Sequence, residues 1–597
     1  MNVDPITFAV IKSGLDSIAD DMAYTVVRIA RSEIVKDVMD FSAAICAADG
    51  QMVAQAKTIA QHLGAIPEAM ESVLTKYGDD LHDGDVVIMN DPYHGGMHLP
   101  DIFMFVPLFY EGKRRAFAVV ICHHTDVGGR VPGSNASDST EIYQEGLRLP
   151  PLKLYDKGKL NETLEALIKI NVRVPDRVWG DLSAQFAAAQ VGKRGLTKLL
   201  QRYGADDVEA YMQELLDYAE RLTKAEIKQW PKGTYRCTDY IDSDGFSDTP
   251  IPINVAITVR EDGTLFVDYT GSSPQVKGAL NSTLSFTHSL TYLSVRCVLG
   301  RDVPNNVGVF RCIDVKAPEA SVLNPVMPGP CAARALTGYR VFDTMLGALS
   351  QIVPDRVPAA GEGGNSVICI SGLRPNRKPF IIVDMICGAW GGRPDKDGLE
   401  AVTNASQNLS NMPVEVMEAE HPVRVEEYQF VPDSCGAGHW RGGIGIRRSY
   451  RLLAKEALLQ MRTDRVAFRP YGLAGGEPGG PSRNSMIING ETRELPGKIT
   501  MTIPNDVVVI HDQAGAGGFG DPLTRDAGLV LEDVIDGKIT ADFARDRHGI
   551  VIAGKSIDQA ATERLRREKS QMANGNARDG TRNRHAKQNR TKAGSQF

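Results

Sequence analysis

Residues 90–129 read NDPYHGGMHLPDIFMFVPLFYEGKRRAFAVVICHHTDVGG, an apolar stretch with imidazoles and carboxylates gathered at both ends. Met104–Tyr110 and Arg115–Cys122 have the apolar, β-branched and aromatic composition of strands, although one proline interrupts the first. Between them, Glu111–Arg114 is a polar segment that contains glycine. This pattern predicts an antiparallel hairpin whose open end carries the polar side chains.

The register of that hairpin brings the polar residues together. Pairing centred on the turn places His123 opposite residues 100–102, and therefore beside Asp101. His98 and Asp101 are three apart and would face opposite sides of a flat strand. They can face one point only if the chain bends at Leu99-Pro100, and proline favours that bend.

Histidine and aspartate together are ligands that suit Zn²⁺, Mn²⁺ or Fe²⁺. A single histidine at a strand end is more often a polar core residue, but three converging positions favour a metal. His123 and His124 should point to opposite sides of the sheet, so that only one is a ligand. Asp37 and Asp40 are upstream candidates for a fourth ligand, and Asp40 could equally cap a turn.

The whole chain has the composition of a globular protein. It has 597 residues, 42% hydrophobic and 24% charged, with a net charge of −7. This length predicts two to four domains. No apolar run approaches the ~20 residues of a membrane-spanning helix, and the first residues do not resemble a signal peptide. Nine scattered cysteines without a Cys-x-x-Cys motif indicate reduced thiols and a cytoplasmic protein, with Cys122 buried and inert rather than catalytic.

Periodicity predicts an α+β (mixed α/β), multidomain chain, with an N-terminal α/β metal-binding domain followed by β-rich domains. Helices are expected at 4–31, 68–77, 161–170, 181–229, 286–299 and 334–352. Strands are expected at 41–46, 51–56, 84–89, 235–240, 251–259 and 265–269. The predicted domains are 1–230, a middle α+β domain at 231–358, a glycine-rich β-dominated domain at 359–560, and a basic, disordered tail at 561–597.

The chain lacks the sequence patterns of nucleotide-binding loops. Gly497-Lys498 and Gly537-Lys538 have no glycine at the upstream position that a phosphate-binding loop requires. The glycine clusters at 436–445, 475–480 and 515–520 do not open a helix, so turns in a β-rich domain explain them better than phosphate cradles. If nucleotide chemistry is involved, this chain is not expected to bind the nucleotide.

Several stretches resemble the hydantoinase B/oxoprolinase family, which includes N-methylhydantoinase B, the caprolactamase β chain and the metal-binding subunits of acetone and acetophenone carboxylases. They are DFSAAI (40–45), NDPYHGGMHLPD (90–101), HHTDVGG (123–129), YQEGLRLPPLKL (143–154), NNVGVFR (305–311), GPCAARALTGYR (329–340), GHWRGGIG (438–445) and GAGGFGDP (515–522). The resemblance covers about 550 residues, and only the basic tail lies outside it. Its length is typical of the hydantoinase branch.

The resemblance implies one divalent metal, Zn²⁺ or Mn²⁺ foremost, held by Asp40, His98, Asp101 and His123. Met97 stands where the family often has threonine, without a clear consequence for the metal. The resemblance also implies a partner, a hydantoinase A-type (actin/Hsp70-like) ATPase that carries ATP and Mg²⁺, in an (AB)₂ hetero-tetramer. No nucleic acid or membrane is expected among the partners.

The preferred interpretation is the metal-binding subunit of an ATP-dependent cyclic amidase that opens a small hydantoin, lactam or oxoproline-like ring. Asp126 or Asp91 could orient a ligand imidazole or act as a general base, and a structural role in turns is equally compatible with the sequence. The alternative is the metal-binding subunit of a ketone carboxylase. A non-catalytic scaffold is less favoured, because closed structural zinc sites usually use cysteine.

Overall fold

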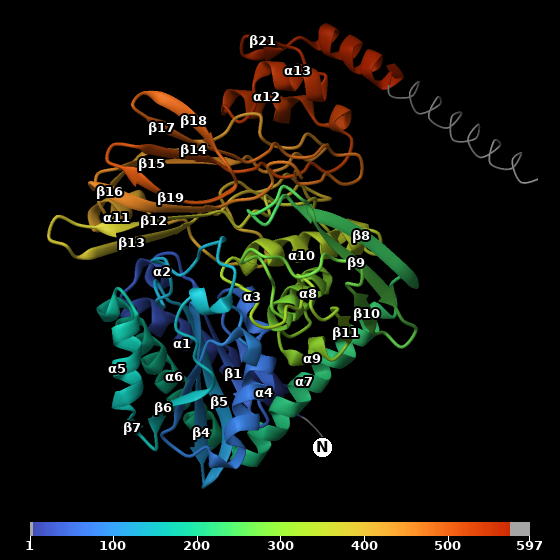
Figure 1. Cartoon of the computed structure of the whole chain (residues 1–597). Coiled ribbons are helices and arrows are strands. Elements are labelled where there is room, and N and C mark those ends of the chain that lie inside the picture. Colours follow the sequence, from blue (N-terminus) through green and yellow to red (C-terminus); the bar gives the residue numbers. More distant parts are fainter. Residues whose placement is uncertain (1–3, 573–597) are drawn as a thin grey trace, which may run out of the picture.

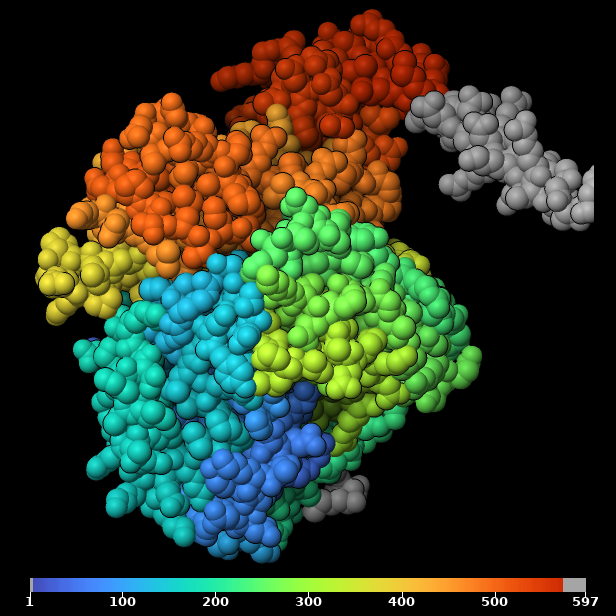
Figure 2. Space-filling view, in the orientation of Figure 1, coloured from blue at the N-terminus to red at the C-terminus, as the bar shows by residue number. Residues whose placement is uncertain are grey.

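The computed structural model describes residues 4–572. The chain is mixed α/β and multidomain, as predicted. Three regions lie against one another in Figure 1: an N-terminal region in blue and teal, a middle region in green, and a β-rich C-terminal region from yellow to red. Figure 2 shows the C-terminal region seated on both of the others. No helix in the described part of the chain is long and apolar enough to cross a membrane.

The N-terminal region is built around a seven-stranded sheet with the order β2-β1-β5-β4-β3-β6-β7. Its strands are β1 (Phe41–Ala47), β2 (Met52–Gln55), β3 (Val86–Met89), β4 (Asp101–Tyr110), β5 (Lys113–His123), β6 (Leu152–Asp156) and β7 (Lys159–Leu160). Its helices are α1 (Pro5–Ile29), α2 (Glu33–Lys36), α3 (Ala60–Leu63), α4 (Ile66–Tyr77), α5 (Glu162–Asn171), α6 (Pro175–Tyr203) and α7 (Ala205–Ile227).

Both faces of this sheet are buried, which explains why its central strands are almost continuously apolar. Alternate residues of β1 belong to different cores: Ala43 and Ile45 pack in the cluster that contains α1 and α6. Ala44 and Cys46 pack in the cluster shared with α4 and with the middle region. The sheet therefore lies between one layer that contains α1 and α6 and a second layer that contains α4 and packs against the middle region.

The predicted hairpin is confirmed. β4 and β5 pair antiparallel, and Asp101 is the register partner of His123. Pro107 does not interrupt β4; it stays paired with Phe117, and the ladder shifts at a bulge after Leu108. β1 and β2, which correspond to the strands expected at 41–46 and 51–56, also pair antiparallel.

One predicted helix is wrong in extent. The segment 181–229 was expected to be continuous, but Gly204 separates α6 from α7. Gly204 has φ +87°, a conformation that glycine adopts without the strain that a side chain would cause. The apolar period continues on both sides of the break, so periodicity alone does not show it.

The middle region packs a four-stranded sheet against helices. The sheet has the order β11-β10-β9-β8, and β11 is parallel to β10. Every residue of α10 is buried, since this helix lies between the sheet and α8. The elements are β8 (Gly233–Ile241), β9 (Ile251–Val259), β10 (Leu265–Asp268), β11 (Ile313–Lys316), α8 (Leu284–Val298), α9 (Val307–Phe310) and α10 (Arg334–Leu349).

The C-terminal region contains two antiparallel sheets and a small helical unit. The first sheet has the order β13-β12-β16-β19 and the second β14-β15-β20-β17-β18. The strands are β12 (Val367–Leu373), β13 (Pro379–Met385), β14 (Val423–Phe430), β15 (Ile446–Leu452), β16 (Glu456–Arg462), β17 (Arg483–Ile488), β18 (Glu491–Leu495), β19 (Lys498–Pro504), β20 (Val508–Asp512), β21 (Ile552–Ala553) and β22 (Ser556–Ile557). The helices are α11 (Val414–Glu420), α12 (Ala527–Ile535) and α13 (Ala541–His548).

Residues 559–572 also form a helix, with Thr562 buried. The prediction of a disordered tail from residue 561 is therefore wrong over this stretch. The low apolar content hid a helix that caps the small helical unit, where Arg566 donates hydrogen bonds to the carbonyls of His548 and Arg525. The remainder of the predicted tail, 573–597, lies outside the described residues.

The glycine clusters of the C-terminal region pack backbone against backbone. Trp440 and Phe519 exchange two backbone hydrogen bonds, which joins the segment 436–445 to 515–520. A Cβ on Gly442 would lie 2.0 Å from the carbonyl oxygen of Ala516. Glycine is needed there for this close approach.

Gly442→Ala is expected to lower the stability of the C-terminal region by about 1–3 kcal/mol or more, because the backbone at Ala516 must move away. Urea unfolding followed by tryptophan fluorescence would measure the loss. Gly14→Ala is the matched control: it lies within α1, and its added Cβ meets only the flexible end of Leu199 at 3.2 Å. Equal stability of Gly442→Ala and the wild type would contradict the packing described.

The buried His511 of β20 is expected to make the stability of the C-terminal sheets depend on pH. It is fully buried, its Nδ1 lies 2.7 Å from Asn484 Oδ1, and burial lowers its pKa to about 4. The unfolded chain therefore binds more protons than the folded chain between pH 6.5 and 4, so stability is present above this window and is lost as the pH falls. At pH 5 the contribution of His511 is expected to lower the free energy of unfolding by about 2 kcal/mol relative to pH 7.5.

The comparison of wild type with His511→Gln isolates this contribution, since the other buried histidines are common to both proteins. The variant should lose less stability than the wild type between pH 7.5 and pH 5 in urea unfolding. A parallel decline of the two proteins would show that His511 binds protons equally in the folded and unfolded states, so that folding does not lower its pKa.

Buried ion pairs join the middle region to the C-terminal region. Arg340 of α10 contacts Asp239 at 3.2 Å and also pairs with Asp464, while Lys498 contacts Asp464 at 3.2 Å. Arg465 pairs with Asp239 at 3.0 Å. Arg340, Arg465 and Asp464 are 0–1% exposed, and these charges are balanced by one another, by Asp343, which pairs with Arg465, and by nearby backbone.

Candidate metal site

Three adjacent strands bring three of the predicted ligands to one edge of the large sheet. Asp40 immediately precedes β1, and its carbonyl accepts a hydrogen bond from the His123 amide at 3.0 Å. His123 ends β5 and is paired with Asp101, the first residue of β4. The predicted bend before β4 is also present: the Asp101 amide donates to the carbonyl of His98 at 3.1 Å, which turns both side chains the same way.

The side chains of His98, Asp101 and His123 converge. One ligand atom from each lies within 4.8 Å of the others, a geometry that could hold a metal ion. His98 Nε2 is 3.1 Å from Asp101 Oδ2, and the His98 and His123 rings have centroids 5.0 Å apart. Asp40 is not a member of this compact group, although its carboxylate faces the same space through His62. All five side chains are at most 4% exposed.

The hydrogen bonds of His98 determine its tautomer. Its Nδ1 lies 3.0 Å from the carbonyl oxygen of Ala332, which can only accept, so Nδ1 carries the proton. Nε2 therefore presents a lone pair to the space beside Asp101 Oδ2. An imidazole lone pair and a carboxylate oxygen repel each other at this distance, and a cation between them would remove that repulsion.

His62 was not among the predicted ligands, yet it faces the same space. The Ser42 hydroxyl donates its single proton to the carbonyl of Ile59 at 2.8 Å, so it accepts from His62 Nδ1 at 3.2 Å. His62 Nε2 then directs a lone pair toward Asp40 Oδ1 at 3.6 Å and Asp101 Oδ1 at 4.0 Å. The only sequence signal was that six of the twelve histidines of the chain fall between His62 and His124.

Each of the four predicted ligands has a buried polar atom without a hydrogen-bond partner in the described part of the chain: Asp40 Oδ1, His98 Nε2, Asp101 Oδ1 and His123 Nδ1. Unpartnered buried polar atoms cost free energy and call for a structural reason. Oxygen and imidazole nitrogen atoms are ligands of divalent transition metals. The residues present therefore fit a metal such as Zn²⁺ or Mn²⁺.

The histidines of the site are held in the state that binds metals. Burial lowers the pKa of His98, holds that of His123 well below its usual value, and lowers that of His62 to about 4. All three imidazoles are therefore neutral at neutral pH. Neutral imidazole is the form that can act as a ligand.

The two carboxyl groups differ because of their neighbours. Burial opposes the ionisation of Asp101, but His98 and Arg334 hold its pKa well below the usual value. Burial and the nearby charge of Asp101 raise the pKa of Asp40. Arg334, the first residue of α10, donates to Asp101 Oδ2 at 2.6 Å.

The histidines and the cysteine that were not predicted as ligands have other contacts. Nε2 of His124 lies 3.1 Å from Gln185 of α6, on the opposite side of the sheet from His123, as predicted. His94 is paired with Asp91 at 2.7 Å. Cys122 is fully buried, and burial holds its pKa well above the usual value, so its thiol is protonated.

Asp91 and Asp126, the carboxylates predicted to orient a ligand or to act in catalysis, organise loops. Asp126 accepts hydrogen bonds from the backbone amides of Gly128, Gly133 and Arg173 and from the Arg173 side chain. Asp91 accepts from the amide of Tyr93 and pairs with Arg148 at 2.8 Å. These contacts suit a structural role, and their catalytic role stays a prediction.

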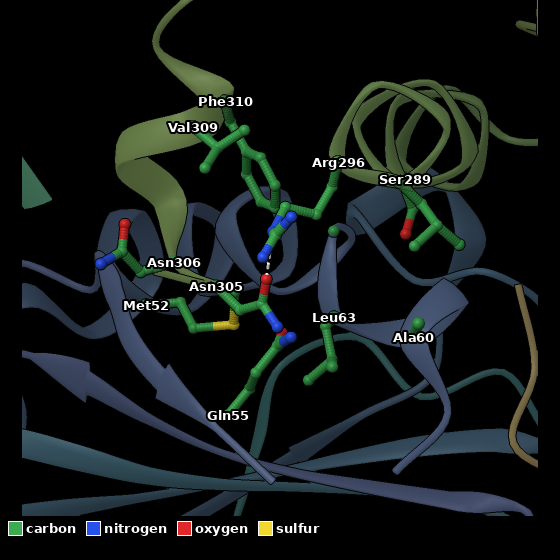
Figure 3. A pocket seen from close by; sticks show the side chains of 12 residues that line it. Met52, Gln55, Ala60, Leu63, Ser289, Arg296, Asn305, Asn306, Val309 and Phe310 are labelled. Carbon is green, nitrogen blue, oxygen red and sulfur yellow. Dashed lines mark hydrogen bonds between the residues drawn. The ribbon is translucent and has the colours of Figure 1, made fainter. Parts of the chain in front are cut away.

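A pocket lies beside α3, the short helix that also carries His62. Ala60 and Leu63 line it, together with Gln55 of β2, Ser289 and Arg296 of α8, and Asn305 (Figure 3). The Arg296 guanidinium bonds to Asn305 and to the carbonyl of Val303, which holds the loop that follows α8. None of the predicted metal ligands is among the residues that line this pocket.

Two relatives with named activities align with nearly the full chain. The B-type chain of a "putative D-/L-hydantoinase" from Pseudomonas sp. (strain NS671) is 34% identical over 590 residues, which cover 95% of this chain and 98% of that protein. The β chain of the caprolactamase from Pseudomonas jessenii is 33% identical over 576 residues, which cover 94% of this chain and 98% of that protein.

Solved structures share the whole architecture. The ATP-dependent caprolactamase from Pseudomonas jessenii has a TM-score of 0.89 at 31% identity, covering 95% of this chain and 100% of its own. Nucleotide-free acetone carboxylase also has a TM-score of 0.89, at 20% identity, covering 96% of this chain and 84% of its own, and at that identity the likeness shows the fold alone. The family model of hydantoinase B/oxoprolinase matches residues 4–522. The chain belongs to the hydantoinase B/oxoprolinase family.

Proposed function

We propose that this chain is the metal-binding B-type subunit of an ATP-dependent cyclic amidase. One observation carries the proposal: Asp40 Oδ1, His98 Nε2, Asp101 Oδ1 and His123 Nδ1 are buried close together and have no hydrogen-bond partner in the described part of the chain. Relatives that are hydantoinase and caprolactamase chains support hydrolysis of an amide as the activity. A small hydantoin, lactam or oxoproline-like ring is the proposed substrate.

The proposed ligands are Asp40, His98, Asp101 and His123, and the proposed metal is Zn²⁺ or Mn²⁺. When bound in such a site, a divalent metal supplies Lewis acidity and lowers the pKa of a coordinated water. The chain's own contribution is to orient His98 through the Ala332 carbonyl and to keep the imidazoles neutral. Burial of every ligand keeps bulk water from the site.

We propose His62 as the group that accepts a proton during the reaction, although burial lowers its pKa to about 4. Its Nδ1 is held by Ser42, so Nε2 is free to take a proton from water at the carboxylate cluster. The carboxylates of Asp40 and Asp101 would then stabilise the imidazolium. This assignment gives His62 the acid–base role that the sequence offered to Asp91 or Asp126.

The proposed partner is a hydantoinase A-type (actin/Hsp70-like) ATPase that phosphorylates the ring carbonyl, in an (AB)₂ hetero-tetramer with ATP and Mg²⁺ on the partner. An amide carbonyl is a poor electrophile, and phosphorylation turns its oxygen into a leaving group. The relatives are themselves named as the B-type and β chains of their enzymes, which supports a partner, and the caprolactamase is ATP-dependent. A cytoplasmic location stays a prediction.

The test is turnover by this chain purified together with an A-type ATPase, which we expect to be encoded in the neighbouring reading frame. With ATP, Mg²⁺ and Zn²⁺ or Mn²⁺, hydantoin, caprolactam and 5-oxoproline are offered in turn, and the ring-opened acid and ADP are measured. Equal amounts of acid and ADP from one ring are expected. ATP hydrolysis that requires a ketone and bicarbonate, without amide turnover, would contradict the amidase and support the carboxylase.

The carboxylase alternative has weaker support. The chain spans 100% of the caprolactamase chain but 84% of the acetone carboxylase chain, at 31% and 20% identity. A scaffold with a structural metal remains a third proposal, tested by whether the fold depends on the metal ligand His98.

A further inference from the structure

Two buried guanidinium groups flank His98. Arg334 reaches it through Asp101, to which it donates at 2.6 Å. Arg462, the last residue of β16, donates to the Ala332 carbonyl at 2.9 Å, the same oxygen that accepts from His98 Nδ1. Arg334 and Arg462 are 3% and 4% exposed. Two like charges are thus buried beside one imidazole, which is costly without a compensating anion.

Both guanidinium groups keep unused donors. The Nε atoms of Arg334 and Arg462 are buried and have no hydrogen-bond partner in the described part of the chain. Arg462 has only a carbonyl and the amide oxygen of Asn365 as partners there, at 2.9 and 3.4 Å. Arg334 has one carboxylate, Asp101, and lies over the ring of Phe286 at 4.2 Å. Arginine forks of this kind match the geometry of carboxylate and phosphate.

The charges of the proposed site also favour the binding of an anion. As ligands of a divalent metal, the carboxylates of Asp40 and Asp101 would balance the charges of Arg334 and Arg462, which are buried beside them. The divalent metal then leaves a net charge of about +2 in a space without bulk water. An anionic ligand group is the simplest compensation for this excess.

We infer that Arg334 and Arg462 form an oxyanion-binding subsite beside the metal site, which takes the phosphoryl or carboxylate group of the ligand. The inference rests on the proposed function, because only the activated ring or the ring-opened acid brings such a group to the metal. It goes beyond that function by giving the two arginines a role in binding and by placing the anionic end of the ligand near His98.

The experiment is calorimetric titration of the full-length, metal-loaded chain with inorganic phosphate and, separately, with acetate. Arg462→Gln should weaken binding of the preferred anion by about tenfold to a hundredfold, since charge-assisted hydrogen bonds are lost. Arg462→Lys keeps the positive charge but not the planar guanidinium group, and it should lose less affinity for the anion than Arg462→Gln. Arg493→Gln, an exposed arginine of β18, is the control and should bind like the wild type. Metal content and melting temperature are measured for every variant.

Tighter binding of phosphate identifies the phosphoryl group as the ligand, and tighter binding of acetate identifies the carboxylate. Either result supports the subsite if Arg462→Gln weakens it while metal content stays unchanged. Wild-type protein that binds neither anion, or Arg462 variants that bind like the wild type, would overturn the inference. If Arg462→Gln does not fold, the comparison of Arg462→Lys with Arg493→Gln decides. Anion binding is measured without turnover, so ring opening can fail while the subsite stands, and the reverse.

Discussion

His98→Ala is expected to abolish metal binding and to reduce ring-opening activity by about 100-fold or more, while the fold is retained. Mutation of residues that only orient ligands typically costs about 10–100-fold, and loss of a ligand should cost at least as much. His98 lies in the turn before β4, outside every strand, so the sheet does not depend on its side chain. Elemental analysis of the purified protein, circular dichroism and the amidase assay measure the three quantities.

His124→Ala is the matched control. It removes an equally buried imidazole from a neighbouring position of the same hairpin, but one that faces Gln185 instead of the carboxylates. Its metal content should equal that of the wild type. Wild-type metal content in His98→Ala would refute the ligand set, and an unfolded His98→Ala protein would instead favour the structural scaffold.

Asp464→Asn is expected to destabilise the contact between the middle and C-terminal regions by about 3–5 kcal/mol, the range for breaking a buried ion pair. Asp464 is 1% exposed and pairs with Arg340 and Lys498. Without its charge, Lys498 loses the carboxylate that balances it. The first transition in urea unfolding and the rate of limited proteolysis measure the effect.

An exposed pair provides the control. Glu491→Gln removes a partner of Arg493 where both side chains are more than half exposed, so the change should stay within about 1 kcal/mol. The double variant Asp464→Asn/Lys498→Met should be more stable than Asp464→Asn alone, because no unbalanced lysine remains. A single variant as stable as the wild type would show that the network does not hold the two regions together.

The local parts of the fold could be predicted from the sequence because short-range patterns determine them. The hairpin of β4 and β5 follows from two apolar runs around a polar turn, and its register followed from the centre of that turn. The break at Gly204 could not be predicted, because the helical period continues on both sides of one glycine. The helix at 559–572 was missed for a different reason: it depends on packing against residues such as His548 and Arg525, not on an apolar face of its own.

The residues of the candidate site also fall into those that local sequence predicts and those that it does not. His98, Asp101 and His123 lie in or beside one hairpin, so their approach could be inferred from spacing, whereas only the family resemblance selected Asp40 over Asp37. Arg334 is 233 residues from Asp101, and Arg462 is 130 residues from Ala332. No local pattern connects residues so far apart, although Arg334 lies within a stretch that matched the family. His62 sits on a helix of four residues, too short to show which face is buried.

One carbonyl oxygen, that of Ala332, receives His98 from the first region of the chain and Arg462 from the third. Severing the gene near residue 230 would therefore not release a working metal-binding module, even though the sheet and all four proposed ligands lie before that point. Such a fragment would keep the ligands but lose the oxygen that sets the tautomer of His98 and both arginines beside it. The proposed metal site therefore depends on all three regions of the chain. For this reason we expect recombination to exchange whole chains of this kind more readily than their parts.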